Sequence, residues 1–481
     1  MTDNPEFWQQ QRFDRVTAPG RQPFEIGHVA SPRGGFSYVA GEILADSDAI
    51  GALTDADQAQ VSPVSGDHDW LDDTGLIQYR YLGDPADLLG FVARWRQGWR
   101  STVPTGRVDL HYVLTGEKST VPRGGPAGTP SLASPHASPT SWGEGPPVVA
   151  VLDTGIDPDS AGAQPMTDGN GVTSTRVVFD PQRDIDILGA TPPVPGEVTE
   201  LLSEAGHGTF IVSLVARFAG GGVRIAALRV LDPDGIGTEQ SVVEGLRRLR
   251  GEFLERYEVA VKVVNLSLGG FTDDGGWVPD SAQRDALYPP ELRDQPPSAL
   301  AAELAHWTGE RLQDTVFVAA AGNDGIVDRP FWPAAFAASP QPSRAVVVSV
   351  ASIDVALRAS SFTNSGDWVK VSSLGEDIVG DYPSGMFRLG PEETETFDGR
   401  GARWSGTSFA APLVAAEIAN VAQHPVPQGI GPAFAASPRS GRDAWSLVEG
   451  EVQAHPAVDA GMGHVWDPRA FAPHLDPTEW R

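Results

Sequence analysis

Cysteine is absent from this chain of 481 residues, and lysine occurs only at Lys118, Lys262 and Lys370. Without cysteine the chain has no disulfide, no thiolate zinc site and no cysteine nucleophile. No uninterrupted apolar run reaches the ~18 residues of a membrane span, and the start, MTDNPEFWQQQRFDR, lacks the apolar centre of a secretory signal. We therefore expect a cytoplasmic protein without a membrane anchor.

Positive charge is scarce as well. Asp and Glu number 63 against 35 Lys and Arg, which gives a formal net charge of −28 at pH 7. A surface of this sign repels nucleic acid and anionic lipid and would favour basic partners, but solubility alone is the better explanation of the charge. We expect neither a nucleic-acid nor a membrane partner.

The length favours more than one domain, and the composition changes along the chain. Residues 1–115 contain alternating apolar positions at Ile77–Tyr81 and Val108–Leu114, with a helical pattern between them that starts at Asp84-Pro85. This strand–helix–strand order predicts a small α+β domain. Residues 116–146 are rich in Pro, Gly and Ser and indicate a linker.

From residue 147 to residue 481 the apolar residues form short continuous runs separated by helical patterns. Continuous runs are typical of strands buried on both faces of a parallel sheet. The runs are Val148–Leu152, Ile225–Val230, Val261–Leu268, Val316–Ala320 and Ala345–Val350. Strands alternating with helices predict an α/β fold, a doubly wound and mostly parallel sheet.

Three short blocks carry residues suited to nucleophilic catalysis. They are Asp153-Thr154-Gly155, Gly206-His207-Gly208-Thr209 and Gly406-Thr407-Ser408. Each block alone has an ordinary structural explanation, because Asp and Gly are common in turns and Ser is a common helix cap. The order Asp, His, Ser along one chain is that of the subtilisin type of serine hydrolase.

The blocks resemble those of the subtilisin-like (subtilase) serine peptidases, and two further segments agree. Asn265–Gly270 is similar to the family segment that lines the substrate cleft, and Ala319–Asp324 to the segment that supplies the oxyanion asparagine. The resemblance covers about residues 147–425. It implies a subtilisin-like fold and a serine endopeptidase acting on polypeptides.

A serine hydroxyl is a weak nucleophile unless a base removes its proton, and neutral histidine suits that task near pH 7. In the resemblance His207 is the base for Ser408, and Asp153 orients the imidazole. Ser408 begins a helix, so its N–H can stabilise an oxyanion together with the side chain of Asn323. These four residues are the predicted catalytic set.

The family resemblance also implies that a substrate peptide pairs as an added strand with the cleft segment. The predicted substrate-binding residues are Leu266, Ser267, Leu268, Gly269, Gly270, Gly322 and Asp324. Asp324 would lie near the primary specificity pocket and favour a basic or long side chain. It is equally explained as a solvated surface acid.

The chain departs from the family at several loops. Phe218–Val223 is too short for the asparagine-rich calcium loop of many secreted members, so we expect no tight calcium site and no cofactor. Asp157 and Asp159 could hold a weaker ion, but calcium wants about six to eight oxygens. The long insertions Phe271–Asp314 and Asp381–Arg403 are either lids or docking surfaces, or surface decoration.

The N-terminal domain stands where the family has its inhibitory propeptide. One hypothesis is that residues 36–115 cover the cleft and are released or displaced on activation; the other is a permanent adaptor for a regulatory protein. Two functions compete with the endopeptidase, namely a pseudoprotease that only binds, and an esterase or amidase with the same triad. The intact catalytic blocks disfavour the first, and the strand-pairing cleft disfavours the second.

Overall fold

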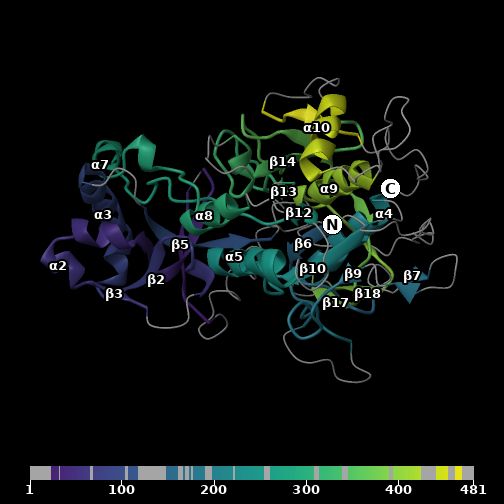
Figure 1. Cartoon of the computed structure of the whole chain (residues 1–481), viewed down its shortest axis with the longest axis horizontal. Coiled ribbons are helices and arrows are strands. Elements are labelled where there is room, and N and C mark those ends of the chain that lie inside the picture. Colours follow the sequence, from purple (N-terminus) through teal and green to yellow (C-terminus); the bar gives the residue numbers. More distant parts are fainter. Residues whose placement is uncertain are drawn as a thin grey trace, which may run out of the picture.

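A computed structural model gives the fold (Figure 1). It describes residues 23–31, 33–64, 69–102, 107–116, 148–160, 166–167, 173–174, 177–189, 198–219, 223–253, 261–307, 314–338, 345–388, 394–423, 440–452 and 461–467. The predicted linker, apart from Gly116, lies outside these residues, as do Gly220–Gly222 in the short loop and Glu392 and Glu393 in the second insertion. No helix among the described residues is long and apolar enough to cross a membrane.

A parallel sheet of eight strands forms the centre of the larger part. Its order is β20-β15-β14-β13-β12-β6-β10-β9, and every neighbouring pair is parallel. The strands are β6 (Val148–Asp153), β9 (Val177–Val178), β10 (Arg224–Arg229), β12 (Val261–Leu266), β13 (Val316–Ala320), β14 (Val346–Ile353), β15 (Val371–Leu374) and β20 (His464–Val465). The five predicted apolar runs all lie on these strands, which confirms the α/β class.

Helices follow the strands as the apolar periodicity predicts. Those of the larger part are α4 (His207–Phe218), α5 (Glu239–Arg248), α7 (Ser281–Leu287), α8 (Ser298–His306), α9 (Thr407–Gln423) and α10 (Gly441–Val452). Thr238 caps α5 through a capping box with Ser241. Helix α9 packs against α4 and α10 and runs along the central strands, so Ser408 in its first turn lies at the sheet (Figure 1).

The N-terminal region contains the predicted strand–helix–strand unit within a larger sheet. Its strands are β1 (Ile26–Val29), β2 (Phe36–Asp46), β3 (Val61–Pro63), β4 (Leu76–Tyr81) and β5 (Val108–Thr115), and its helices are α2 (Asp55–Gln58) and α3 (Leu88–Thr102). Asp84 caps a short 3-10 turn, Pro85–Asp87, that leads into α3. The sheet order is β11-β5-β2-β4-β3, with β1 beside β2.

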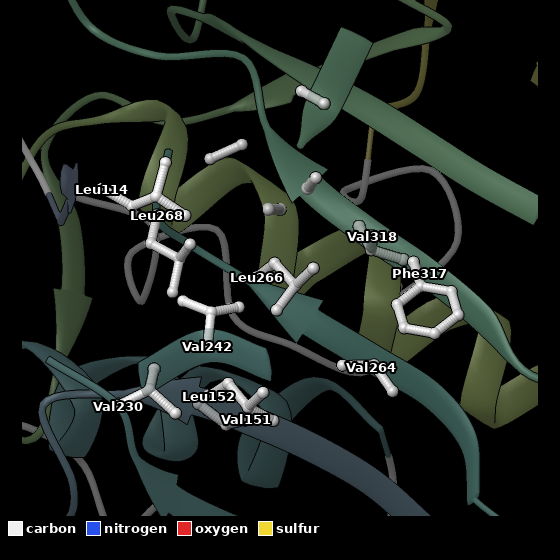
Figure 2. Close-up of a cluster of buried hydrophobic side chains, with 14 of the residues drawn as sticks. Leu114, Val151, Leu152, Val230, Val242, Val264, Leu266, Leu268, Phe317 and Val318 are labelled. Carbon is white, nitrogen blue, oxygen red and sulfur yellow. The ribbon is translucent and has the colours of Figure 1, made fainter. Parts of the chain in front are cut away.

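The edge strand β11 (Ile236–Thr238) of this second sheet comes from the larger part of the chain. It pairs antiparallel with β5, Ile236 opposite Thr115 and Thr238 opposite Val113. The apolar core is continuous across the junction, where Leu114 lies among Leu268 and Val242 (Figure 2). The N-terminal region is therefore packed onto the larger part rather than hanging from a linker.

The first insertion, from Phe271 onward, lies against the N-terminal region. Gln97 of α3 donates to the carbonyl oxygens of Ala286 and Leu287, both at 2.5 Å. Arg96, also of α3, is buried and contacts the Tyr288 hydroxyl in a hydrogen bond. These contacts attach the first insertion to the N-terminal region.

The second insertion lies beside the start of α4. Together with the residues that flank it, it forms two antiparallel pairs, β16 with β19 and β17 with β18. Their bounds are β16 (Ile378–Gly380), β17 (Ser384–Arg388), β18 (Thr394–Asp398) and β19 (Ala402–Trp404); the hairpin β7 (Met166–Thr167) with β8 (Thr173–Ser174) stands apart. Trp404 packs edge-on against the His207 ring, with the ring centroids 5.4 Å apart. Trp404, the residue directly after this insertion, thus forms part of the wall around the predicted catalytic histidine.

Candidate active site

Asp153 and His207 meet at the ends of a strand and a helix. Asp153 is the last residue of β6 and His207 the first residue of α4. His207 Nδ1 lies 2.7 Å from Asp153 Oδ1, and both side chains are buried. Asp153 Oδ1 also accepts the N–H of Thr154 at 2.8 Å, which fixes the carboxylate.

The glycines of the first two blocks allow this contact. A Cβ at Gly208 would collide with the carbonyl oxygen of Gly155, so the histidine helix reaches the Asp153 turn only through glycine. Gly155 has φ of 101° and Gly206 has φ of 83°, both left-handed conformations that L side chains rarely adopt. The spacing of the two blocks therefore has a backbone reason as well as a chemical one.

The His207 imidazole is fully enclosed. Burial alone would lower the pKa of His207, but the nearby Asp153 carboxylate raises it above its ordinary value. Nδ1 faces Asp153, and Nε2 has no hydrogen-bond partner among the described residues although it is buried. A buried ring nitrogen without a partner is costly, so Nε2 is placed to accept a proton from a group that arrives there.

Ser408 is buried in the first turn of α9, next to Phe409, whose ring centroid lies 5.4 Å from that of His207. Its hydroxyl lies 3.4 Å from the carbonyl oxygen of Ser267, and no hydrogen bond to His207 occurs among the described residues. The Ser408 carbonyl accepts the Ser267 hydroxyl at 2.8 Å. The serine block is thus fastened to the predicted cleft segment.

Asn323 is held by the residue before the serine. Its Oδ1 accepts the Thr407 N–H at 2.8 Å and the Thr407 hydroxyl at 2.9 Å. The same hydroxyl accepts the N–H of Gly322 at 3.0 Å. Because Oδ1 is occupied by two donors, the side-chain amide is oriented with Nδ2 as the group that remains to donate.

The predicted substrate-binding residues fall into two groups. Leu266 ends β12 and is buried, and Ser267 to Gly270 continue past the sheet beside Ser408. Gly322 has φ of 95°, and a Cβ there would meet the side chain of Asn364. Asp324 is partly buried, and its backbone N–H and its carboxylate both contact the Asn364 amide.

The end of β5 pairs with the cleft segment that follows β12. Thr115 donates its N–H to Gly269 O at 2.9 Å and accepts the Gly269 N–H at 2.8 Å. On its other side Thr115 pairs with Ile236, and Gly116 donates to Gly235 O at 2.8 Å. The end of β5 is therefore an extended segment paired on both edges between β11 and the residues after β12.

Asp157 and Asp159, considered as a weak ion site, lie in a local turn. The Asp159 N–H donates to Asp157 Oδ1 at 3.0 Å. Among the described residues no group of three or more His, Asp or Glu side chains is arranged to hold a metal ion. The peptide group of Asp157 also donates to the Thr209 hydroxyl, which ties this turn to the histidine block.

The sequence patterns missed Asp186. This buried carboxyl accepts the N–H of Gly206, the residue before His207, at 2.7 Å. It follows no motif and precedes no helix, and only the fold brings it to the site. Burial raises the pKa of Asp186 to about 7, against the lowering effect of its hydrogen bonds from Gly206 and Thr154.

Comparison with known families gives a direct result. The model of the subtilase family matches residues 145–438, which is more than half of the 481 residues. The chain belongs to the subtilase family. The match contains Asp153, His207, Asn323 and Ser408, so the site described above lies wholly within the family region.

Curated proteins that are similar to this chain are also named as proteases. An intracellular serine protease of Paenibacillus polymyxa is 25% identical over 279 residues, which are 57% of this chain and 66% of that protein. Subtilisin-like protease 4 of Arthroderma gypseum is 30% identical over 215 residues, which are 44% of this chain and 41% of that protein. This subtilase thus spans less than two thirds of the length of these relatives.

Solved structures of low sequence identity are also similar to this subtilase. The protease domain of PatA is 19% identical, with a TM-score of 0.44, and the match covers 70% of this chain and 98% of that domain. A cold-adapted subtilisin-like serine proteinase is 20% identical, with a TM-score of 0.39 over 66% of this chain and 87% of that protein.

Proposed function

We propose that this subtilase is a serine endopeptidase that cleaves peptide bonds through an acyl-enzyme intermediate, without a cofactor. Ser408 is the nucleophile, His207 the general base and Asp153 the residue that orients the base. The observation that carries the proposal is the 2.7 Å contact between His207 Nδ1 and Asp153 Oδ1, which leaves Nε2 buried and open to a partner.

The Asp153 contact selects the tautomer with the proton on Nδ1 and the lone pair on Nε2. The Ser408 hydroxyl turns from the Ser267 carbonyl toward Nε2 and gives up its proton as its oxygen attacks the substrate carbonyl carbon. The leaving amine takes that proton from His207, and water repeats the sequence to release the acyl group. Asp153 stays ionised throughout.

The oxyanion of each tetrahedral intermediate is stabilised by two donors. One is the Ser408 N–H at the start of α9, where the helix dipole adds positive potential. The other is Asn323 Nδ2, which the two Thr407 contacts to Oδ1 hold in place. Donors fixed before the reaction stabilise developing charge without reorganising.

Peptides fit this cleft better than small esters or amides. The residues beside Ser408 already pair with an extended segment, since Thr115 exchanges two backbone hydrogen bonds with Gly269. An extended peptide bound this way is recognised through its main chain, as in other strand-addition complexes. The segment that pairs with Gly269 is the end of the chain's own β5, so we further propose that the N-terminal region inhibits the enzyme by filling the cleft.

The paired end of β5 lies close to the proposed nucleophile. Thr115 is opposite Gly269 in an antiparallel pair, and the carbonyl of Ser267, two residues before Gly269, is next to Ser408. The described part of this segment ends at Gly116, where the predicted linker begins. We propose that self-cleavage falls in the linker, residues 116–146.

Two measurements test the proposal. A fluorophosphonate should add once to the wild-type chain and not to Ser408→Ala, as read by intact mass. Equal labelling of both would exclude Ser408 as the nucleophile, and no labelling of either, before and after cleavage in the linker, would favour a pseudoprotease. Incubation of the wild type should yield a break in the linker, residues 116–146, that Ser408→Ala lacks. A wild-type chain that stays whole and active would favour the permanent adaptor.

A further inference from the structure

Asp186 lies where three segments of the active site meet. It lies in the chain between β9 and α4, and 5% of its surface is exposed. Its Oδ2 accepts the Gly206 N–H at 2.7 Å and the Thr154 hydroxyl at 3.1 Å. Its Oδ1 is buried without a hydrogen-bond partner among the described residues.

The two donors flank the catalytic pair. Gly206 directly precedes His207, and Thr154 directly follows Asp153. The Thr154 hydroxyl, while it donates to Asp186, accepts the N–H of Gly208 at 3.0 Å. One carboxyl oxygen thus fixes the N–H of Gly206, the residue before His207, directly, and the N–H of Gly208, the residue after it, through Thr154.

We infer that Asp186 is a positioning residue for His207, and that it holds the imidazole in place through the backbone on both sides of the ring. The inference rests on the proposed function, since it assigns a role to a residue around the proposed base. Asp186 does not touch the reacting atoms. It acts through Gly206 and Thr154.

The charge of Asp186 gives this role a measurable signature. The titratable groups around it are Asp153, Asp157, Glu204, His207 and Tyr382. Burial, then the carboxylates of Asp153 and Asp157, raise the pKa of Asp186, and its negative charge in turn raises the pKa of His207. An ionised Asp186 therefore keeps His207 protonated to higher pH, and its loss should let His207 become a free base at lower pH.

Asp186→Asn tests the charge while keeping an oxygen acceptor for Gly206 and Thr154. The acid limb of the rate of fluorophosphonate labelling against pH should shift to lower pH in this variant. The low-field Nδ1 proton of His207, followed by NMR in the full chain, should titrate with a lower midpoint. Glu417→Gln is the matched control, because burial also raises the pKa of Glu417 to about 7 but its hydrogen-bond partner is Asn420.

Asp186→Ala removes the acceptor as well. Misplacing a catalytic group by about 1 Å costs on the order of 10²-fold in rate, so labelling per folded molecule should fall by at least ~10-fold, and Asp186→Asn should restore most of it. Unchanged midpoints and pH profiles in Asp186→Asn, or a shift of equal size in Glu417→Gln, would overturn the inference. The His207 midpoint decides this even if Ser408→Ala shows that the proposed nucleophile is wrong.

Discussion

The contact between Thr115 and Gly269 should control access of peptides to the cleft. Thr115→Pro deletes the N–H that donates to Gly269 O at 2.9 Å, while Thr115→Val keeps both backbone bonds and deletes only the hydroxyl, 3.4 Å from the same oxygen. The two variants alter the same position, but only the first breaks the ladder.

The size of the effect follows from the bonds lost. A backbone hydrogen bond contributes about 0.5–1.5 kcal/mol, and a buried acceptor left unpaired costs about 1–3 kcal/mol more. Thr115→Pro should therefore favour the displaced state of the segment by about 3 kcal/mol. Because ~1.4 kcal/mol is a factor of ten, the open fraction should rise about 100-fold, and Thr115→Val should stay within about 2-fold of wild type.

The assay compares two reagents on each chain. A tetrapeptidyl diphenyl phosphonate must pair with Leu268–Gly270, whereas a small alkyl fluorophosphonate needs only to reach Ser408. Thr115→Pro should speed reaction with the peptidyl reagent and change the small one little. If the ratio of the two rates equals that of wild type in a variant that circular dichroism shows to be folded, the segment does not block the cleft and the reasoning fails.

Three further outcomes are expected. Asn323→Ala should lower turnover of a peptide substrate roughly 10²–10³-fold with KM little changed, a range that comes from subtilisin itself, and a loss below about 3-fold would remove Asn323 from the oxyanion site. The pKa of Asp186 rises from 3.8 to about 7 on folding, so between these values the folded chain holds a proton that the unfolded chain releases. The free energy of unfolding of the wild type should therefore fall by about 4 kcal/mol relative to that of Asp186→Asn between pH 4 and pH 8. Urea unfolding at both pH values measures this, and a difference that does not change with pH would contradict it. Arg329→Met breaks the ion pair with Asp294 at 2.8 Å, within the larger part, and the bonds to the carbonyls of Arg33 and Gly34, which join the N-terminal region to it. It should destabilise the folded chain by about 3–5 kcal/mol, and an unchanged unfolding midpoint would refute that.

The sequence predicted those parts of the molecule whose residue types are set by their local surroundings. The apolar runs located the central strands because a strand buried on both faces must be continuously apolar. The backbone at Gly155 and at the glycines beside His207 approaches its neighbours too closely for a side chain. These glycines therefore form a motif that can be recognised from the sequence alone. The roles assigned to Asn323 and Ser408 remain predictions that the labelling experiments address.

Contacts between distant segments could not be predicted in this way. Asp186 lies 20 residues from Gly206 along the chain in a stretch with no periodic pattern, and nothing local marks it as a partner of the histidine block. The pairing of β11 with β5 joins residues more than 100 positions apart. Such contacts depend on how the complete sheet is assembled, which a periodicity of two or 3.6 residues does not encode.

The docked region presents two kinds of bond with different consequences. Near the cleft, the N-terminal region is attached by a short ladder of neutral backbone hydrogen bonds at Thr115 and Gly116, and each of these bonds is of modest strength. Away from it, the fully buried Arg329 donates to the carbonyl oxygens of Arg33 and Gly34, and the buried Arg96 contacts the Tyr288 hydroxyl and lies 3.9 Å from the buried Asp273 carboxylate. Hydrogen bonds from buried charged groups are strongly destabilising to break. Opening of the cleft segment alone is therefore much less costly than dissociation of the whole region. A peptide substrate can gain access by displacing the end of β5 while the rest of the N-terminal region stays docked, so cleavage of the linker need not release it.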